Sequence, residues 1–366
     1  MRSNGDSKVY FGVREMKVCL LAPVPPPAGG IAGWTKRMMS AKLKNNWHVE
    51  VVDEQVIGGR TNFGKTAQRH FIIEIKRCFK IWINLNNKLF FDKDIKIVQS
   101  CVPAGMGSLA REMVCKWITH FYRRKYVIHF RCTVPNMVKS KVHIYLFKAF
   151  VKSAESVFVL NEQSLFFSRV LCPKQNYKVI PNFIDNKELY LRPTVNEKIQ
   201  RILYVGGVIP EKGCEKILSI ARKFPNIEFR LVGKVGINTE AIPDNVILCG
   251  EQKKDYVNEE LETADVFMFL SKFWGEGFSN ALAEAMGKSL PCIVSDWAAN
   301  ADMIQDKGGI VVDVENEDEI VDAIKKIEDP HIRKKMGVWN YERVKNEYSQ
   351  KVITDQYVDA YEELLK

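Results

Sequence analysis

Residues 276–294 constrain the fold of this chain more than any other stretch, because they carry the pattern of a loop, a helix and a strand in succession. They read Glu-Gly-Phe-Ser-Asn-Ala-Leu-Ala-Glu-Ala-Met-Gly-Lys-Ser-Leu-Pro-Cys-Ile-Val. Ala, Leu and Met favour helix, and Ser279 or Asn280 is a suitable N-cap. Gly287 and Pro291 end this helix, and the apolar residues that follow are typical of a buried parallel strand. The stretch therefore predicts part of an α/β domain.

Two carboxylates stand eight positions apart in this stretch. Glu276 falls in the loop just before the helix, and Glu284 falls within its second turn. Free backbone N–H groups and the positive end of the helix dipole form an anion site at such a helix start, most often for a phosphate. The plain alternative is a solvated helix that happens to carry two glutamates. The sequence favours a phosphate site flanked by two acidic side chains.

Strand and helix patterns alternate along the rest of the chain. Apolar runs of strand type occupy residues 17–22, 48–52, 95–99, 126–130, 156–160, 201–206, 227–232, 246–250, 265–270, 291–295 and 308–312. The chain has 366 residues and 46% hydrophobic content, enough for two domains with separate cores. This alternation predicts two doubly wound α/β domains facing a cleft, with the ligand at the carboxyl ends of the second domain's strands.

Three segments together resemble the retaining glycosyltransferases of family 4, which have the GT-B fold. Residues 276–294 resemble the donor site of that family. Residues 205–213, Val-Gly-Gly-Val-Ile-Pro-Glu-Lys-Gly, and residues 178–185, Lys-Val-Ile-Pro-Asn-Phe-Ile-Asp, are similar to two further segments of it. The likeness covers nearly the whole chain and is weakest at residues 55–150. It implies two Rossmann-like domains and a C-terminal helix that crosses back to the first.

The resemblance also implies the domain organisation. We expect residues 1–15 to be a flexible leader and residues 16–190 to form an N-terminal, acceptor-binding Rossmann-like domain. Residues 191–345 would form a C-terminal, nucleotide-sugar-binding Rossmann-like domain. The last residues, 346–366, would be a helix that packs back on the N-terminal domain.

The site residues follow from the same resemblance. It implies that Glu284 binds the ribose hydroxyls of a nucleotide sugar, that Glu276 binds the sugar's own hydroxyls, and that Lys212 faces the diphosphate. A histidine at the strand end occupied by His129 points toward the transferred sugar in related enzymes, so the expected catalytic residues are His129, Lys212 and Glu276. The expected donor-binding residues are Gly29, Gly30, Gly207, Lys212, Gly277, Phe278, Ser279, Asn280, Ala281 and Glu284.

One position departs from the family pattern. Gly207 stands where family members usually have an arginine that pairs with the donor diphosphate. The change removes a bidentate contact. Either Lys212 and the backbone suffice for the diphosphate, or another cation substitutes.

The resemblance implies transfer of a sugar with retention of anomeric configuration and without a metal or other cofactor. The expected donor is a UDP-sugar, with GDP-mannose second. The acceptor is expected to be a glycan, in particular a polyprenyl-diphosphate-linked one in O-antigen or capsule synthesis. Two alternatives are a GT-B sugar-nucleotide epimerase and a non-catalytic sugar-nucleotide-binding protein, the latter suggested by Gly207.

Charge is unevenly distributed along the chain. Residues 1–190 contain 31 Lys and Arg against 13 Asp and Glu, whereas the remainder is acidic overall. Basic, amphipathic and aromatic patterns occur at residues 66–90 and 111–126. They predict surface helices packed on a sheet, an interfacial face that docks on an anionic membrane, or both. No nucleic-acid-binding module is recognisable.

The expected location is the cytoplasm, at the inner face of the cytoplasmic membrane. The first fifteen residues lack the apolar core of a secretory signal, and no window has eighteen uninterrupted apolar residues. The nine cysteines are scattered singly, without a Cys-x-x-Cys pair, which is typical of reduced thiols rather than a zinc site or a disulfide framework.

Overall fold

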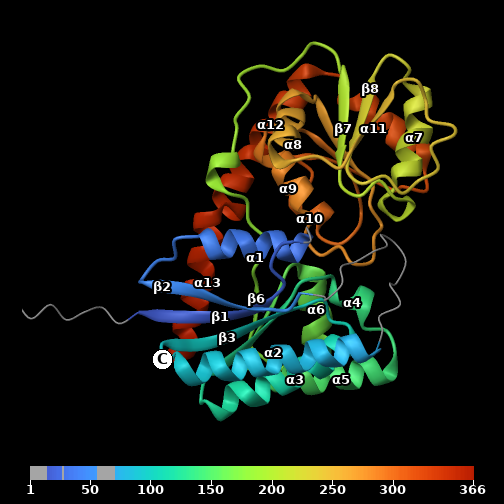
Figure 1. Ribbon diagram of the computed structural model, residues 1–366. Coiled ribbons are helices and arrows are strands. Elements are labelled where there is room, and N and C mark those ends of the chain that lie inside the picture. The colour runs from blue at the N-terminus through green and yellow to red at the C-terminus, as the bar shows by residue number, and fades with distance from the viewer. Residues whose placement is uncertain (1–14, 27–28, 56–70) are drawn as a thin grey trace, which may run out of the picture.

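The computed structural model describes residues 15–26, 29–55 and 71–366, which form two α/β lobes (Figure 1). Each lobe contains a six-stranded sheet. The strand orders are β2-β1-β3-β4-β5-β6 and β12-β11-β10-β7-β8-β9. All strand pairs in both sheets are parallel. The predicted fold class, two doubly wound Rossmann-like domains, is confirmed.

The first lobe contains the sheet strands β1 to β6 and the helices α1 to α6. The strands are β1 (Met16–Ala22), β2 (Trp47–Asp53), β3 (Ile95–Val102), β4 (Lys125–Phe130), β5 (Ser156–Val159) and β6 (Tyr177–Val179). The helices are α1 (Gly30–Ser40), α2 (Phe71–Phe91), α3 (Met106–Phe121), α4 (Val134–Met137), α5 (Lys141–Lys152) and α6 (Glu162–Leu171).

The second lobe follows a short 3₁₀ turn, η1 (Asn186–Glu188), in the connection. Its strands are β7 (Arg201–Val205), β8 (Glu228–Val232), β9 (Val246–Gly250), β10 (Val266–Phe269), β11 (Cys292–Ser295) and β12 (Gly309–Val312). Its helical elements are η2 (Pro210–Lys212), α7 (Cys214–Lys223), α8 (Lys254–Thr263), α9 (Asn280–Gly287), α10 (Asn300–Ile304), α11 (Glu317–Lys326), α12 (Pro330–Arg343) and η3 (Val344–Tyr348). The last helix is α13 (Gln350–Leu365).

The first sheet is covered on both faces, which is why β1 is apolar without alternation. Its Cys19 and Leu21 belong to the core beneath α2, α3 and α5, whereas Val18 and Leu20 belong to the core beneath α1. All four side chains are fully buried. A strand of alternating polarity could not occupy this position.

The C-terminal helix α13 completes the core on the α1 side of the first sheet. Its Tyr357 and Tyr361 are fully buried in one cluster with Trp34 of α1 and Phe158 of β5. The Tyr361 hydroxyl donates to Gln99 Oε1 of β3 at 2.7 Å. The predicted return of the C-terminal helix to the first domain is therefore confirmed, as the red helix against the blue and green strands shows (Figure 1).

Some of the predicted segments lie outside the described residues. These are residues 1–14 of the expected leader and residues 66–70 at the start of the expected amphipathic segment. Within the part of the chain that the structure describes, no helix combines the length and the apolar character needed to span a bilayer.

Candidate functional site

The helix start predicted from residues 276–294 is present. Ser279 is the N-cap of α9, and its hydroxyl accepts a hydrogen bond from the backbone N–H of Leu282 at 3.2 Å. Glu276 lies in the loop that precedes this cap, and Glu284 lies in the second turn. Both carboxylates are mostly enclosed, with side-chain exposures of 13% and 14%. Such enclosure contradicts the alternative of two freely solvated glutamates.

Lys212 and Glu276 come together at the point where the order of the second sheet reverses. Lys212 follows β7, Glu276 follows β10, and these two strands are neighbours in the sheet. The Lys212 Nζ lies 3.4 Å from Glu276 Oε2 and 5.4 Å from the centre of the Phe273 ring. A sheet of this type binds its ligand outside the carboxyl ends of the strands at such a switch point.

The turn that presents Lys212 depends on the glycine that follows it. Gly213 has a φ of 75°, and a Cβ atom there would lie 2.2 Å from the carbonyl oxygen of Leu270. Glycine alone fits both the left-handed backbone and this close approach. The Lys212 Nζ lies 5.9 Å from the centre of the ring of Phe269, the last residue of β10.

Glu284 is flanked by two basic side chains. The Lys254 Nζ lies 2.9 Å from Glu284 Oε2 and also 2.9 Å from Glu188 Oε2. From the first domain, the Arg37 Nη1 lies 3.7 Å from Glu284 Oε1. Neither Lys254 nor Arg37 was predicted from the sequence, because a basic residue on an amphipathic helix is ordinarily solvated and no motif distinguishes these two.

The first domain holds the loop from Glu276 to Asn280 by hydrogen bonds from Thr133, Asn161 and Asn182. The backbone N–H of Thr133 donates to the Glu276 carbonyl oxygen at 3.2 Å. The Asn161 side chain donates to the Gly277 carbonyl oxygen at 2.7 Å. The Asn182 side chain donates to Asn280 Oδ1 at 2.9 Å. The segment around Asn182 is recognisable in the sequence, but these contacts are not.

Gly277 is the point of closest approach between this loop and the first domain. A Cβ atom at Gly277 would lie 2.9 Å from the Cα of Cys132 and 2.7 Å from a methyl carbon of Leu160. Next to it, Phe278 is 5% exposed, and its ring meets that of Tyr348 edge to face at 5.1 Å. Gly277 therefore contacts the first domain directly, whereas the Phe278 ring packs within the second domain and only its carbonyl oxygen contacts the first, accepting a hydrogen bond from Asn182 at 3.3 Å.

His129 is fully buried at the end of β4. Its Nδ1 lies 3.1 Å from the Tyr357 hydroxyl of α13, and its ring nitrogens lie 3.3 and 3.4 Å from Arg131 Nη1. Burial, followed by the charge of Arg131, holds the pKa of His129 well below its usual range, so the ring is neutral at pH 7. These contacts do not bring it to Lys212 or Glu276, and its role toward a sugar stays a prediction.

Arg131 connects this buried cluster to the loop before α9. Its guanidinium lies 4.0 Å from the centre of the Trp34 ring and donates to Asn182 Oδ1. Asn182 in turn contacts Asn280. A continuous series of contacts therefore runs from α13 to the helix start of the second domain.

The remaining glycines of the expected donor site lie at the start of α1 and in the loop after β7. Gly29 is the N-cap of α1 with extended backbone, and a Cβ atom at Gly29 or Gly30 would have no heavy atom within 4 Å. The Gly207 carbonyl oxygen accepts a hydrogen bond from the Tyr204 hydroxyl at 2.8 Å. Burial raises the pKa of Tyr204 well above its usual value, which keeps this hydroxyl protonated.

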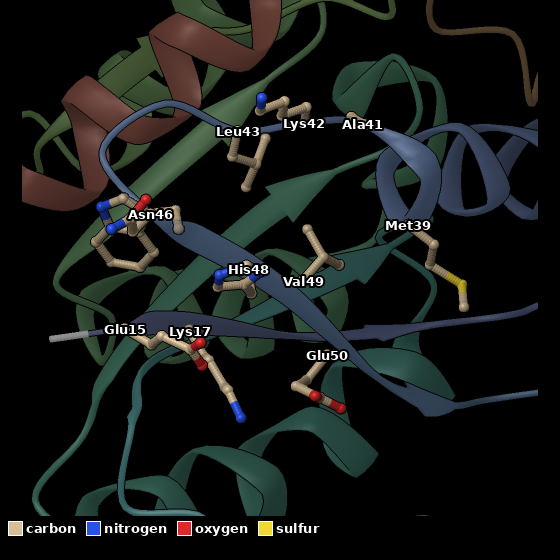
Figure 2. Close-up of a pocket in the computed structure, with 11 residues that line it drawn as sticks. Glu15, Lys17, Met39, Ala41, Lys42, Leu43, Asn46, His48, Val49 and Glu50 are labelled. Atoms are coloured by element: carbon tan, nitrogen blue, oxygen red, sulfur yellow. The ribbon is translucent and has the colours of Figure 1, made fainter. Parts of the chain in front are cut away.

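A separate pocket of about 440 Å³ lies at the amino ends of β1 and β2 (Figure 2). Lys17, His48 and Glu50 are among the side chains that surround it. It lies at the opposite end of the first-sheet strands from Thr133, Asn161 and Asn182, which follow the carboxyl ends of β4, β5 and β6. The pocket is therefore separate from the site around Lys212.

Comparison with known proteins relates this arrangement to a family. A model of the family described as glycosyl transferases group 1 matches residues 187–343. None of the curated proteins matches the chain. Among solved structures, the chain is similar to sucrose-phosphate synthase from Thermosynechococcus elongatus, with a TM-score of 0.76, 16% identity, and coverage of 96% of this chain and 99% of that one.

Two further structures show the same fold at similar length. One is the lipopolysaccharide outer core galactosyltransferase WaaB in its apo form, with a TM-score of 0.68, 15% identity, and coverage of 95% of this chain and 99% of that one. The other is HepE from Anabaena in complex with UDP-glucose, with a TM-score of 0.67, 14% identity, and coverage of 95% and 100%. At these identities the likeness concerns the fold, and the family model matches the second domain alone. Residues 187–343 thus resemble the glycosyl transferases group 1, and the chain as a whole has the GT-B fold.

Proposed function

We propose that this protein is a glycosyltransferase that moves a sugar from a nucleoside-diphosphate sugar to a glycan acceptor with retention of configuration. The observation that carries the proposal is the pairing of Lys212 with Glu276 at 3.4 Å beside the start of α9. This arrangement sets a cation and free backbone N–H groups next to a carboxylate. The cation and the backbone N–H groups suit a diphosphate, and the carboxylate suits the hydroxyls of a sugar.

In this proposal the diphosphate binds Lys212 and the N-terminus of α9. Glu276 accepts hydrogen bonds from the sugar hydroxyls, and Glu284, one turn further along α9, accepts them from the ribose. Negative charge builds on the diphosphate as the bond to the sugar breaks. Donors already aimed at that charge stabilise the transition state more than the ground state.

The proposed path for retention is a front-side displacement. The acceptor hydroxyl oxygen forms the new bond to the anomeric carbon on the face from which the diphosphate leaves, and its proton passes to a phosphate oxygen of the donor. The protein's part is to position both substrates, and no metal takes part. Transfer in the presence of EDTA, with the anomeric configuration of the product read by NMR, tests both statements. An inverted product, or activity abolished by EDTA and restored by a divalent cation, would contradict them.

The proposed donor is a UDP-sugar, with GDP-mannose second. The HepE structure in complex with UDP-glucose shares this fold. We expect thermal stabilisation by one of UDP, GDP, ADP and CMP, because a ligand at a hundred times its dissociation constant stabilises the folded state by about 2.7 kcal/mol. The shift should be lost in Lys212→Ala and Glu284→Ala.

The matched control for this experiment is Lys272→Ala. Lys272 is an exposed lysine near the same strand end, paired with Glu315 at 3.0 Å, and its loss should leave the shift unchanged. A shift with none of the nucleotides would favour a non-catalytic role. Altered nucleotide sugar formed without an acceptor would favour an epimerase.

We further propose that the enzyme works at the inner face of the cytoplasmic membrane on a lipid-linked acceptor. The support is an apolar and basic surface on α2 and α3, which pack side by side on the face of the first sheet opposite α1 (Figure 1). Exposed apolar side chains on these helices are Ile72, Ile75, Phe79, Ile83, Phe90, Phe91, Trp117 and Phe121. Exposed basic side chains beside them are Lys76, Lys80, Arg123 and Lys125.

We expect the protein to sediment with phosphatidylglycerol vesicles at low salt and less with phosphatidylcholine vesicles, because anionic headgroups attract the basic residues. The double variant Trp117→Ser, Phe121→Ser should bind at least about tenfold more weakly, since the two rings are 60% and 80% exposed and free to enter the interface. Phe166→Ser on α6, 73% exposed, is the matched control. Equal sedimentation of all three proteins, or none by the unaltered one, would contradict the proposal.

A further inference from the structure

We infer that Arg37 of the first domain binds the donor diphosphate and supplies the guanidinium that the second domain lacks at Gly207. The inference rests on the proposed function, because it assumes that a nucleoside diphosphate occupies the site at α9. It makes the donor site a joint product of both domains. Three observations support it.

The first observation is position. Arg37 lies in α1, and its guanidinium reaches the second domain, where Nη1 is 3.7 Å from Glu284 Oε1. Its Cζ lies 5.8 Å from the centre of the Phe183 ring, and the side chain is 19% exposed. The cation therefore lies against α9 rather than in open solvent.

The second observation is that this guanidinium is poorly satisfied. Its Nε and Nη2 are buried, and neither has a hydrogen-bond partner among the described residues. The distance of 3.7 Å between its Nη1 and Glu284 Oε1 is longer than a hydrogen bond. Buried N–H groups without an acceptor are rare, because each loses its hydration without compensation. A diphosphate offers several oxygens that match the fork of an arginine.

The third observation is reach. Glu284 is four residues from Asn280, the first residue of α9. This spacing corresponds to about 6 Å along a helix axis. A change of rotamer would therefore bring the Arg37 guanidinium to a phosphate at the start of α9. Glu284 keeps a partner when Arg37 moves away, since Lys254 remains 2.9 Å from its other oxygen.

These facts suggest an exchange of partners. Without donor, Arg37 faces Glu284 across the domain contact. When donor binds, the ribose takes its place at Glu284, and the guanidinium moves to the phosphates as the domains close on them. The competing explanation is that Arg37 only holds the Glu284 carboxylate in place. That explanation predicts an equal effect on any ligand that carries the ribose.

The experiment compares a nucleoside with its diphosphate. Binding of UDP is measured by calorimetry and binding of uridine by ligand-observed NMR, or of the corresponding pair if another base is selected. Arg37→Ala should weaken UDP binding by about 10- to 100-fold, as for loss of charge-assisted hydrogen bonds. It should change uridine binding by less than about twofold, because uridine has no phosphate to accept hydrogen bonds from the guanidinium. Arg37→Lys, which keeps the charge but not the fork, should fall between.

The matched control is Lys36→Ala, an exposed cation on the same helix, which should leave both affinities unchanged. Equal weakening of UDP and uridine by Arg37→Ala, or no weakening of UDP, would overturn the inference while leaving the proposed function intact. Failure of the unaltered protein to bind any nucleotide would overturn the proposed function, and this inference with it. Thermal unfolding of each variant confirms that it is folded.

Discussion

Replacing Lys212 with alanine is expected to lower kcat by about 10²- to 10³-fold, the range seen when one preorganised donor to a developing anion is removed. The ammonium is one of the charges that the proposed mechanism aims at the leaving diphosphate. Its loss also leaves the Glu276 carboxylate, which is 13% exposed, without its partner at 3.4 Å. Because charge on the diphosphate grows toward the transition state, kcat should fall more than KM rises.

The measurement is release of the nucleoside diphosphate at saturating donor and acceptor. Lys272→Ala is again the matched control and should retain nearly full activity, since that lysine pairs with the exposed Glu315. An Lys212→Ala protein that is folded and turns over at a normal rate would exclude Lys212 from the chemistry. A rise in KM at constant kcat would make it a binding residue only.

The second large effect is expected at Gly277, where alanine should lower kcat/KM by about 100-fold without unfolding either domain. The new Cβ would lie 2.9 Å from the Cα of Cys132, and backbone of the other domain moves aside only if the whole domain moves. The hydrogen bonds that Thr133 and Asn161 donate to this loop would then lengthen. Misplacement of a catalytic group by about 1 Å can cost 10²-fold in rate.

Activity is measured together with small-angle scattering, which should report a larger radius of gyration for Gly277→Ala. Gly107→Ala is the matched control, because no heavy atom lies within 4 Å of a Cβ atom there. Gly277 does not have a left-handed backbone conformation. The effect of the substitution therefore comes from the space that the new Cβ atom needs and not from backbone strain. Full activity in Gly277→Ala would show that the contact between the loop and the first domain is dispensable.

The sequence predicted the parts of this fold that depend on local pattern. Continuous apolar strands and the cap at Ser279 follow from residue type and spacing. The proximity of Lys212 and Glu276 required more, because they are 64 residues apart and meet only because β7 and β10 are neighbours. The family resemblance implied that Lys212 and Glu276 lie close together. The periodicity of apolar residues could not imply this.

The contacts across the two domains could not be predicted. Arg37 and Glu284 are separated by most of the chain, and nothing in the pattern of α1 marks one of its two adjacent cations as the one that faces α9. The burial of His129 under α13 is a similar case. The local sequence around a polar residue at a strand end is the same whether solvent or a tyrosine from a distant helix covers it. The helical stretch from Pro330 to Tyr348 is divided into α12 and the π-helical η3, a change of hydrogen-bond register that composition does not encode.

The return of α13 to the first domain has a consequence for how the protein is made on the ribosome. The cluster around Trp34 and Phe158 is closed by Tyr357 and Tyr361, so the first half of the nascent chain emerges without the element that seals its core. At translation rates of about 5–20 residues per second, the second half takes roughly ten to forty seconds to follow. During that interval the apolar surface beside α1 that α13 covers in the finished protein stays exposed to solvent. The core of the second domain comes almost entirely from residues 199–348, so this domain can fold before the first is complete.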